Sequence, residues 1–162
     1  PVLILNIVKG MENSSTLTQI ERGFRDYFEK NLIFVKNPIN TLIINSTDES
    51  VISQELTKFY IRNPLIKGVF VTTSKAHVVA GFHQKHELDI RLIGFDLVDG
   101  NINCLQEGSI DWIISQSPVQ QGARAVKTLF DLLIHKTAPK PVQYVPLDII
   151  IRENLDFYLD FQ

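Results

Sequence analysis

Short polar side chains follow the apolar runs of this sequence, and these side chains are the groups best suited to chemistry. Most are Ser, Thr, Asn or Gln, which donate and accept hydrogen bonds without carrying a formal charge. They lie in the segments Lys9–Ser15, Ser46–Glu49, Thr72–Ser74, Asp96–Asn101 and Ser115–Gln121. A rim of such groups suits a small, neutral ligand with several hydroxyl groups.

Residue patterns typical of catalytic and metal sites are missing from the sequence. It contains no Gly-x-Ser-x-Gly elbow, no P-loop and no Gly-x-Gly-x-x-Gly motif. His83 and His86 are three residues apart and His77 is six residues before His83, but no pattern supplies further ligands. We therefore expect a solvated helix face at these histidines, no metal, no cofactor and no enzymatic activity.

Composition favours a globular binding domain. The 162 residues are 44% hydrophobic and 21% charged, with a net charge of −2, so no strong positive field attracts nucleic acid. No apolar run reaches the ~20 residues of a membrane span. The lone Cys104 permits no internal disulfide, which fits a reducing compartment. Because the chain begins at Pro1 inside an apolar run, we expect a piece of a longer protein.

Apolar runs alternate with segments of helical period along the chain. The runs are rich in Val and Ile at successive positions, as in parallel strands that are covered on both faces. The predicted strands are Val2–Val8, Thr41–Asn45, Gly68–Thr72, Ile90–Phe95, Asp111–Ser115 and Gln143–Ile151. The predicted helices are Thr16–Asn31, Ser50–Arg62, Ser74–His86, Asn101–Gln106 (stopped by Gly108) and Pro118–Lys136. This order predicts one α/β unit over residues 1–162, with a doubly wound, mostly parallel sheet flanked by helices.

The polar segments meet at one edge in such a fold. Ligands of open parallel sheets bind outside the carboxyl ends of the strands. The tail, Asn154–Gln162, has no packing partner that the sequence identifies.

Several local patterns resemble the lac-repressor (LacI) and type I periplasmic binding protein family. The chain resembles the C-terminal half of the effector-binding module, without the N-terminal lobe and the DNA-binding headpiece. The matching segments are Gly23-Phe24, Gly68–Ala76, Ile93–Asp96, Ile114–Pro118 with Gly122, and Leu147–Arg152. Two positions depart from the family pattern: Ile20 replaces an Arg, and Thr72-Thr73 replaces an Asn-Asp pair.

The resemblance implies a site and a function. Asp96 and Gln116 match ligand-contacting positions. Thr73 stands within the family's Asn-Asp pair, a polar anchor that the threonines weaken, and Ser14 lies in the loop that supplies smaller hydrogen-bonding contacts in relatives. The alternative for each is structural: Asp96, Thr73 or Ser14 capping a turn or helix, and Gln116 as an ordinary turn residue. The implied function is sensing of a sugar or sugar-like effector in the cytoplasm, coupled to DNA binding through the absent headpiece. The alternative is a periplasmic solute-binding protein that serves a transporter or membrane sensor.

One helix face suggests a subunit contact. In the predicted helix Ser74–His86, Ala76, Val79 and Ala80 form the face that should meet the sheet. Val78 and Phe82 lie roughly opposite, and the resemblance implies that this helix contributes to a homodimer interface. We therefore predict that both side chains are partly exposed in the monomer; the alternative is packing under a neighbouring loop.

Overall fold

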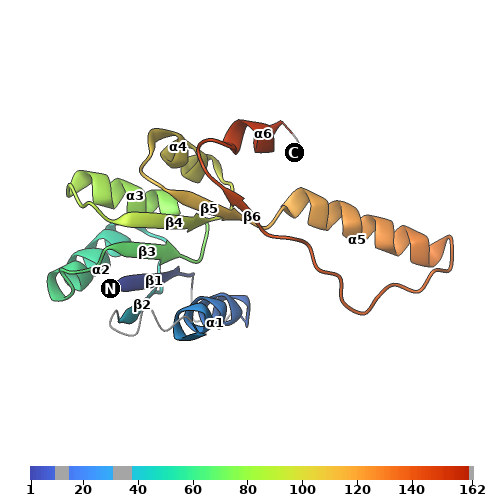
Figure 1. The fold of residues 1–162 in the computed structure, drawn as a ribbon, viewed down its shortest axis with the longest axis horizontal. Helices are drawn as coiled ribbons and strands as arrows, with labels where there is room; N and C mark the ends of the chain where they lie inside the picture. The colour runs from blue at the N-terminus through green and yellow to red at the C-terminus, as the bar shows by residue number, and fades with distance from the viewer. Residues whose placement is uncertain (10–14, 31–37, 161–162) are drawn as a thin grey trace.

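A six-stranded sheet organises the computed structural model, which describes residues 1–9, 15–30 and 38–160. The strand order is β2-β1-β3-β4-β5-β6 (Figure 1). Strands β1 to β5 run parallel, and β6 pairs antiparallel with β5. The strands are β1 (Val2–Ile7), β2 (Ile39–Ile44), β3 (Gly68–Val71), β4 (Arg91–Phe95), β5 (Trp112–Ser115) and β6 (Asp148–Ile150). The predicted doubly wound, mostly parallel α/β fold is confirmed.

Both faces of the central strands are buried, which explains their continuous apolar sequence. In β1, Leu3 and Leu5 contribute to a core with helices on one face, while Ile4 is equally buried on the other face. Burial of apolar surface is the main force that holds such layers together. A strand covered on both faces therefore needs apolar residues at every position, as the sequence has.

Helices cover the two faces unequally. The helices are α1 (Ser15–Lys30), α2 (Glu49–Arg62), α3 (Ala76–Lys85), α4 (Asp99–Glu107), α5 (Pro118–Leu133) and α6 (Leu155–Leu159). Helices α2, α3 and α4 share the main core with the sheet. Helix α1 lies on the other face, where Phe24 stacks on Phe70 with ring centroids 5.4 Å apart. Gly108 ends α4 in the left-handed conformation at φ 81°, as predicted.

Helix α5 extends away from the sheet. It buries none of its residues, and Figure 1 shows it projecting from the end of β5, with the following segment returning to β6. We call residues 118–147 the arm. Its helix is amphipathic, yet Val126 is 70% and Phe130 is 52% exposed. An apolar helical stripe of this kind is normally buried against a partner.

The sequence expectation for the last strand is wrong. The last strand contains three residues and not the predicted nine, because Asp148 pairs with Ser115, where β5 ends. Residues before Asp148 therefore have no strand beside them, and Pro146 lacks a backbone donor. The tail, for which the sequence identified no packing partner, forms helix α6, whose Leu155 is fully buried in the core.

Candidate functional site

Asp96 and Gln116 meet at the carboxyl ends of two neighbouring strands. Asp96 directly follows β4, and Gln116 directly follows β5. The side-chain Nε2 of Gln116 donates to Asp96 Oδ1 at 3.0 Å, and the backbone N–H of Asp96 donates to Ile114 O at 2.9 Å. Both predicted residues therefore lie where open parallel sheets bind ligands.

The backbone is strained at Asp96 itself and at Ser117, the residue after Gln116. Asp96 has φ 66° and Ser117 has φ 50°, in the left-handed region that residues other than glycine rarely adopt. Such conformations cost about 1–3 kcal/mol and persist only where surrounding contacts fix them. They occur preferentially at ligand clamps and other functional positions, which supports a functional role for this edge of the sheet.

Asn101 fixes the backbone at Asp96, and sequence reasoning missed its role. Its side chain is fully buried, and Nδ2 donates to Phe95 O at 3.0 Å and to Asp96 O at 2.9 Å. Its Oδ1 accepts the backbone N–H of His77 at 2.8 Å. The sequence placed Asn101 in the polar rim, but only its complete burial shows that it connects β4, α3 and α4.

The segment after β3 provides an unpaired polar atom. Thr73 Oγ1 is buried and has no hydrogen-bond partner among the described residues. Thr72, its neighbour, is buried and donates to Asn6 Oδ1 of β1. A buried polar atom without a partner is unusual and requires an explanation. A ligand hydroxyl would satisfy Thr73, which agrees with its predicted role; Ser14 lies outside the described residues.

Asp48 of the rim and two charged residues of α1 perform structural tasks. Asp48 caps α2 by accepting the backbone N–H of Ser50 at 2.8 Å, and hydrogen bonds from Ser50 and Val51 lower the pKa of Asp48. Because Arg25 is held by Glu21 at 2.9 Å and by Thr41 at 2.6 Å, its guanidinium is directed to β2. Burial raises the pKa of Glu21, but hydrogen bonds from Thr41 and Arg25 outweigh burial and leave this pKa lowered.

The exposure predicted for helix α3 is wrong at two positions. Phe82 is 7% exposed, and its ring lies 4.4 Å from that of His86 and 6.0 Å from that of Tyr60. His83 is buried as well, and its Nε2 is 2.7 Å from Tyr60 Oη. A helical wheel separates the face toward the sheet from its opposite face but omits the flanking helix α2, which covers both side chains. Val78 is half-buried, and its predicted subunit contact stays a prediction.

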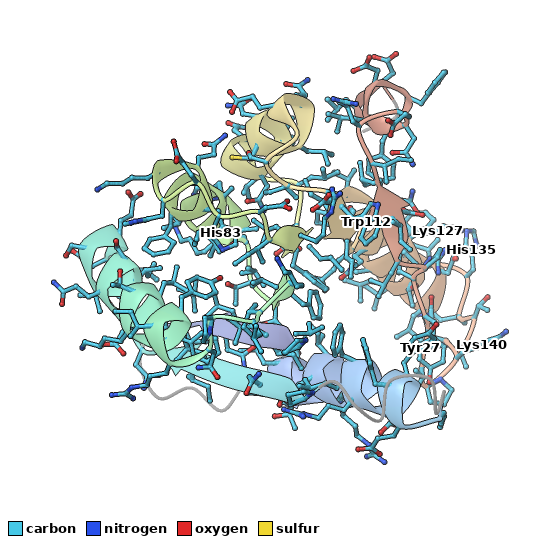
Figure 2. The ribbon with its side chains drawn as sticks, turned by 60° about the vertical axis from the view of Figure 1, so that its left-hand side comes forward. Tyr27, His83, Trp112, Lys127, His135 and Lys140 are labelled. Carbon is cyan, nitrogen blue, oxygen red and sulfur yellow. The ribbon has the colours of Figure 1, made fainter. Side chains whose placement is uncertain are left out.

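Burial controls the protonation of the Tyr60–His83 pair. It lowers the pKa of His83 to about 4 and raises the pKa of Tyr60. His83 is therefore neutral near pH 7. Figure 2 shows His83 within the body of the molecule, apart from Lys127, His135 and Lys140 of the arm.

Metal-ligating residues do not cluster in the described parts of the chain. No group of three or more His, Cys, Asp or Glu side chains there could hold a metal ion. Within the same residues, no helix combines the length and apolar content that crossing a membrane requires.

Comparison with known proteins identifies the family. A model described as "Periplasmic binding protein domain" matches residues 2–137. No curated protein matches the chain.

Similar solved structures agree with the match to this family model. A protein from Bacteroides fragilis assigned as a LacI transcriptional regulator is 30% identical, with a TM-score of 0.85 over 97% of this chain and 54% of that one. A periplasmic ribose ABC transporter protein from Conexibacter woesei DSM 14684 has a TM-score of 0.82 at 18% identity, over 98% and 53%. A solute-binding protein from Actinobacillus succinogenes 130z with bound D-allose has a TM-score of 0.75 at 20% identity, over 96% and 54%.

The chain thus spans about half the length of these relatives. The family model covers most of its residues, and the relatives share its fold over nearly its whole length. This chain belongs to the periplasmic binding protein domain family.

Proposed function

We propose that this chain forms one wall of a sugar-binding cleft in a two-lobed, LacI-type transcription regulator. The Bacteroides fragilis relative supports the regulator assignment, because 30% identity extends over 97% of this chain. Relatives with bound D-allose and bound α-D-tagatopyranose support a carbohydrate as the ligand class. The regulator would act in the cytoplasm and would bind DNA through a segment outside this chain.

The observation that carries this proposal is the Asp96–Gln116 pair. Among the described residues, no hydrogen bond uses Asp96 Oδ2 or Gln116 Oε1. Both oxygens are acceptors, and each sugar hydroxyl can donate to one of them while accepting from another group. Two acceptors held side by side by a hydrogen bond, with the unpaired Thr73 Oγ1 after β3, suit adjacent hydroxyl groups of one ring.

The arm supports a second lobe. Its apolar stripe, which includes Val126 and Phe130, is exposed in this chain. Since the relatives are about twice as long, we infer that the arm packs against the half of the protein that precedes Pro1. Residues 1–162 then constitute one subdomain that supplies about half of the ligand contacts.

The proposed mechanism is a change in population. A sugar that contacts both lobes binds the closed arrangement more tightly than the open one. The sugar can shift the equilibrium between the two arrangements by no more than the difference between its binding free energies for them. In a homodimer that shift would change how the two DNA-binding segments are placed. Val78 on α3 is our candidate for the subunit contact.

The test is to sequence the gene upstream of the Pro1 codon and to assay the encoded protein. A helix-turn-helix segment, together with DNA binding that a sugar weakens or strengthens, is the expected result. DNA binding that no sugar changes would contradict the proposal.

A second function is favoured by the Conexibacter woesei structure, whose TM-score is nearly as high. In that case the chain is half of an exported solute-binding protein, and the same residues hold the sugar. A signal peptide upstream of Pro1, without a DNA-binding segment, would establish this alternative. The sugar-binding assay is common to both functions, whereas the upstream sequence separates them.

A further inference from the structure

Four oxygen-bearing side chains converge where the arm leaves the sheet. Ser117 Oγ donates to Asp148 Oδ2 at 2.8 Å, and Tyr158 Oη donates to the same oxygen at 2.8 Å. Ser117 Oγ and Tyr158 Oη are themselves 2.8 Å apart, and Tyr158 Oη is 3.2 Å from Ser115 Oγ. One carboxylate oxygen of Asp148 therefore accepts hydrogen bonds from two hydroxyl groups that come from different parts of the chain.

This cluster lies at both attachment points of the arm. Ser117 is the last residue before α5, and Asp148 is the first residue after the segment that returns to the sheet. Figure 1 shows α5 and the returning segment joining the body at the neighbouring ends of β5 and β6. A body and an arm that are joined by two adjacent chain crossings can rotate about them unless those crossings are fixed to each other.

The strained backbone of Ser117 depends on these hydrogen bonds. Ser117 is buried at φ 50°, and its hydroxyl does not cap α5. Instead, it points to Asp148 and Tyr158. A strained residue relaxes when the contacts that fix it are removed, and relaxation here would rotate the root of α5.

Tyr158 contributes its hydroxyl from the C-terminal helix, which is anchored independently. Leu155 of α6 is fully buried in the core, and Asn154 binds the backbone N–H of Ile151 at 2.8 Å. Removing only the Tyr158 hydroxyl would therefore leave α6 in place. The neighbouring Phe157 is 72% exposed and takes no part in the cluster, so it provides a matched control.

We propose that Tyr158 is a positioning residue that, with Asp148, clamps Ser117 and thereby sets the direction of the arm. Gln116 directly precedes Ser117, so the clamp also sets the position of Gln116 relative to Asp96. This last consequence for sugar binding rests on the proposed function, whereas the clamp itself does not.

The test measures the direction of the arm directly. Spin labels are placed on Thr137→Cys at the arm and Lys85→Cys on α3, both exposed, in a Cys104→Ser background. Double electron–electron resonance of the whole 162-residue chain then gives the distribution of distances between them. We expect one narrow population for the parent and the Phe157→Leu control, and a distribution at least about twofold wider for Tyr158→Phe.

Two further measurements make the outcome decisive. Asp148→Asn keeps the shape of the side chain while weakening the shared acceptor, so it should widen the distribution as well. Circular dichroism melts should place Tyr158→Phe close to its control, which a merely structural loss of packing would not do. Equal widths in the parent and in both clamp variants would overturn the proposal. A wider distribution with unchanged sugar affinity in the longer protein would contradict the link between the clamp and Gln116. A wider distribution with no sugar binding by the longer protein would contradict the proposed function and leave the clamp standing.

Discussion

Gln116 Nε2 donates to Asp96 Oδ1 across 3.0 Å, and this contact joins the carboxyl ends of β4 and β5. Asp96 is held in the left-handed conformation at φ 66°, and its backbone carbonyl accepts a hydrogen bond from the side chain of Asn101. The side-chain oxygens are thus placed by backbone geometry and by buried hydrogen bonds. A preorganised pair of this kind can bind a ligand without first losing its own freedom.

Substitutions at Asp96 should separate stability from binding. Asp96→Asn tolerates the left-handed backbone and should change the free energy of unfolding by less than about 1 kcal/mol. Asp96→Val should cost about 1–2 kcal/mol because a β-branched residue is strained there. Urea unfolding measures both effects.

In the longer protein, Asp96→Asn should weaken sugar binding by about tenfold or more, since a charged acceptor is lost. Wild-type affinity in that variant would remove Asp96 from the site.

Two glycines offer a matched test of packing. A Cβ at Gly94 of β4 would lie 2.8 Å from the Cβ of Ala76, which is fully buried. We expect Gly94→Ala to destabilise the fold by about 1–3 kcal/mol through overpacking. Gly81 of α3 has open space around it, so Gly81→Ala should stabilise the helix by up to about 1 kcal/mol. Denaturant midpoints compare the two, and effects of equal sign and size would refute this packing.

Asn101 should be indispensable to the turn after β4. Asn101→Ala leaves Phe95 O, Asp96 O and the backbone N–H of His77 without their side-chain partner, at a cost of about 1–3 kcal/mol. Asn103→Ala, an exposed change in the same helix, should stay within about 0.5 kcal/mol. Thermal unfolding of the two variants checks this difference. A negligible loss for Asn101→Ala would mean that water replaces the side chain.

His83 should make the fold sensitive to acid. Its pKa is about 4 in the folded chain and 6.5 in the reference state, so the unfolded chain binds the proton first as the pH falls. The stability that the neutral ring contributes is present above about pH 6.5 and is lost between that value and pH 4. The loss is at most about 3 kcal/mol.

His83→Gln should flatten that part of the stability profile, because glutamine accepts no proton. Gln84→Ala, on the next and exposed residue, should retain the slope of the parent. Urea unfolding at intervals between pH 4 and pH 7 gives both profiles. Parallel profiles for His83→Gln and the parent would show that His83 does not carry the pH dependence.

Much of the fold could be predicted from the sequence because strands buried on both faces leave continuous apolar runs. For β1 to β5 the predicted positions agree with the structure within two residues at either end. The same signal failed at β6, because an apolar run also occurs where no neighbouring strand can pair with it. Amphipathic period correctly predicted α5, but it could not reveal that the apolar stripe faces away from this sheet.

The candidate site could be predicted only in part. Asp96, Gln116 and Thr73 follow strands, and topology alone brings strand ends to one edge. The roles of Asn101, Asp148 and Tyr158 were missed because their side-chain hydrogen bonds join different elements of the fold and leave no periodic pattern in the sequence. Phe82 and His83 were wrongly expected to be exposed, since the position of α2 beside α3 is a tertiary fact.

Sugar binding by the Asp96–Gln116 pair is the central claim, and calorimetric titration tests it most directly. D-allose, D-tagatose and D-ribose are titrated into the protein encoded by the complete gene, into its Gln116→Ala variant and into residues 1–162 alone. We predict micromolar binding of at least one sugar by the complete protein, binding at least about tenfold weaker in Gln116→Ala, and no micromolar binding by the isolated chain. Micromolar binding by residues 1–162 alone, or equal affinity in Gln116→Ala, would contradict the account.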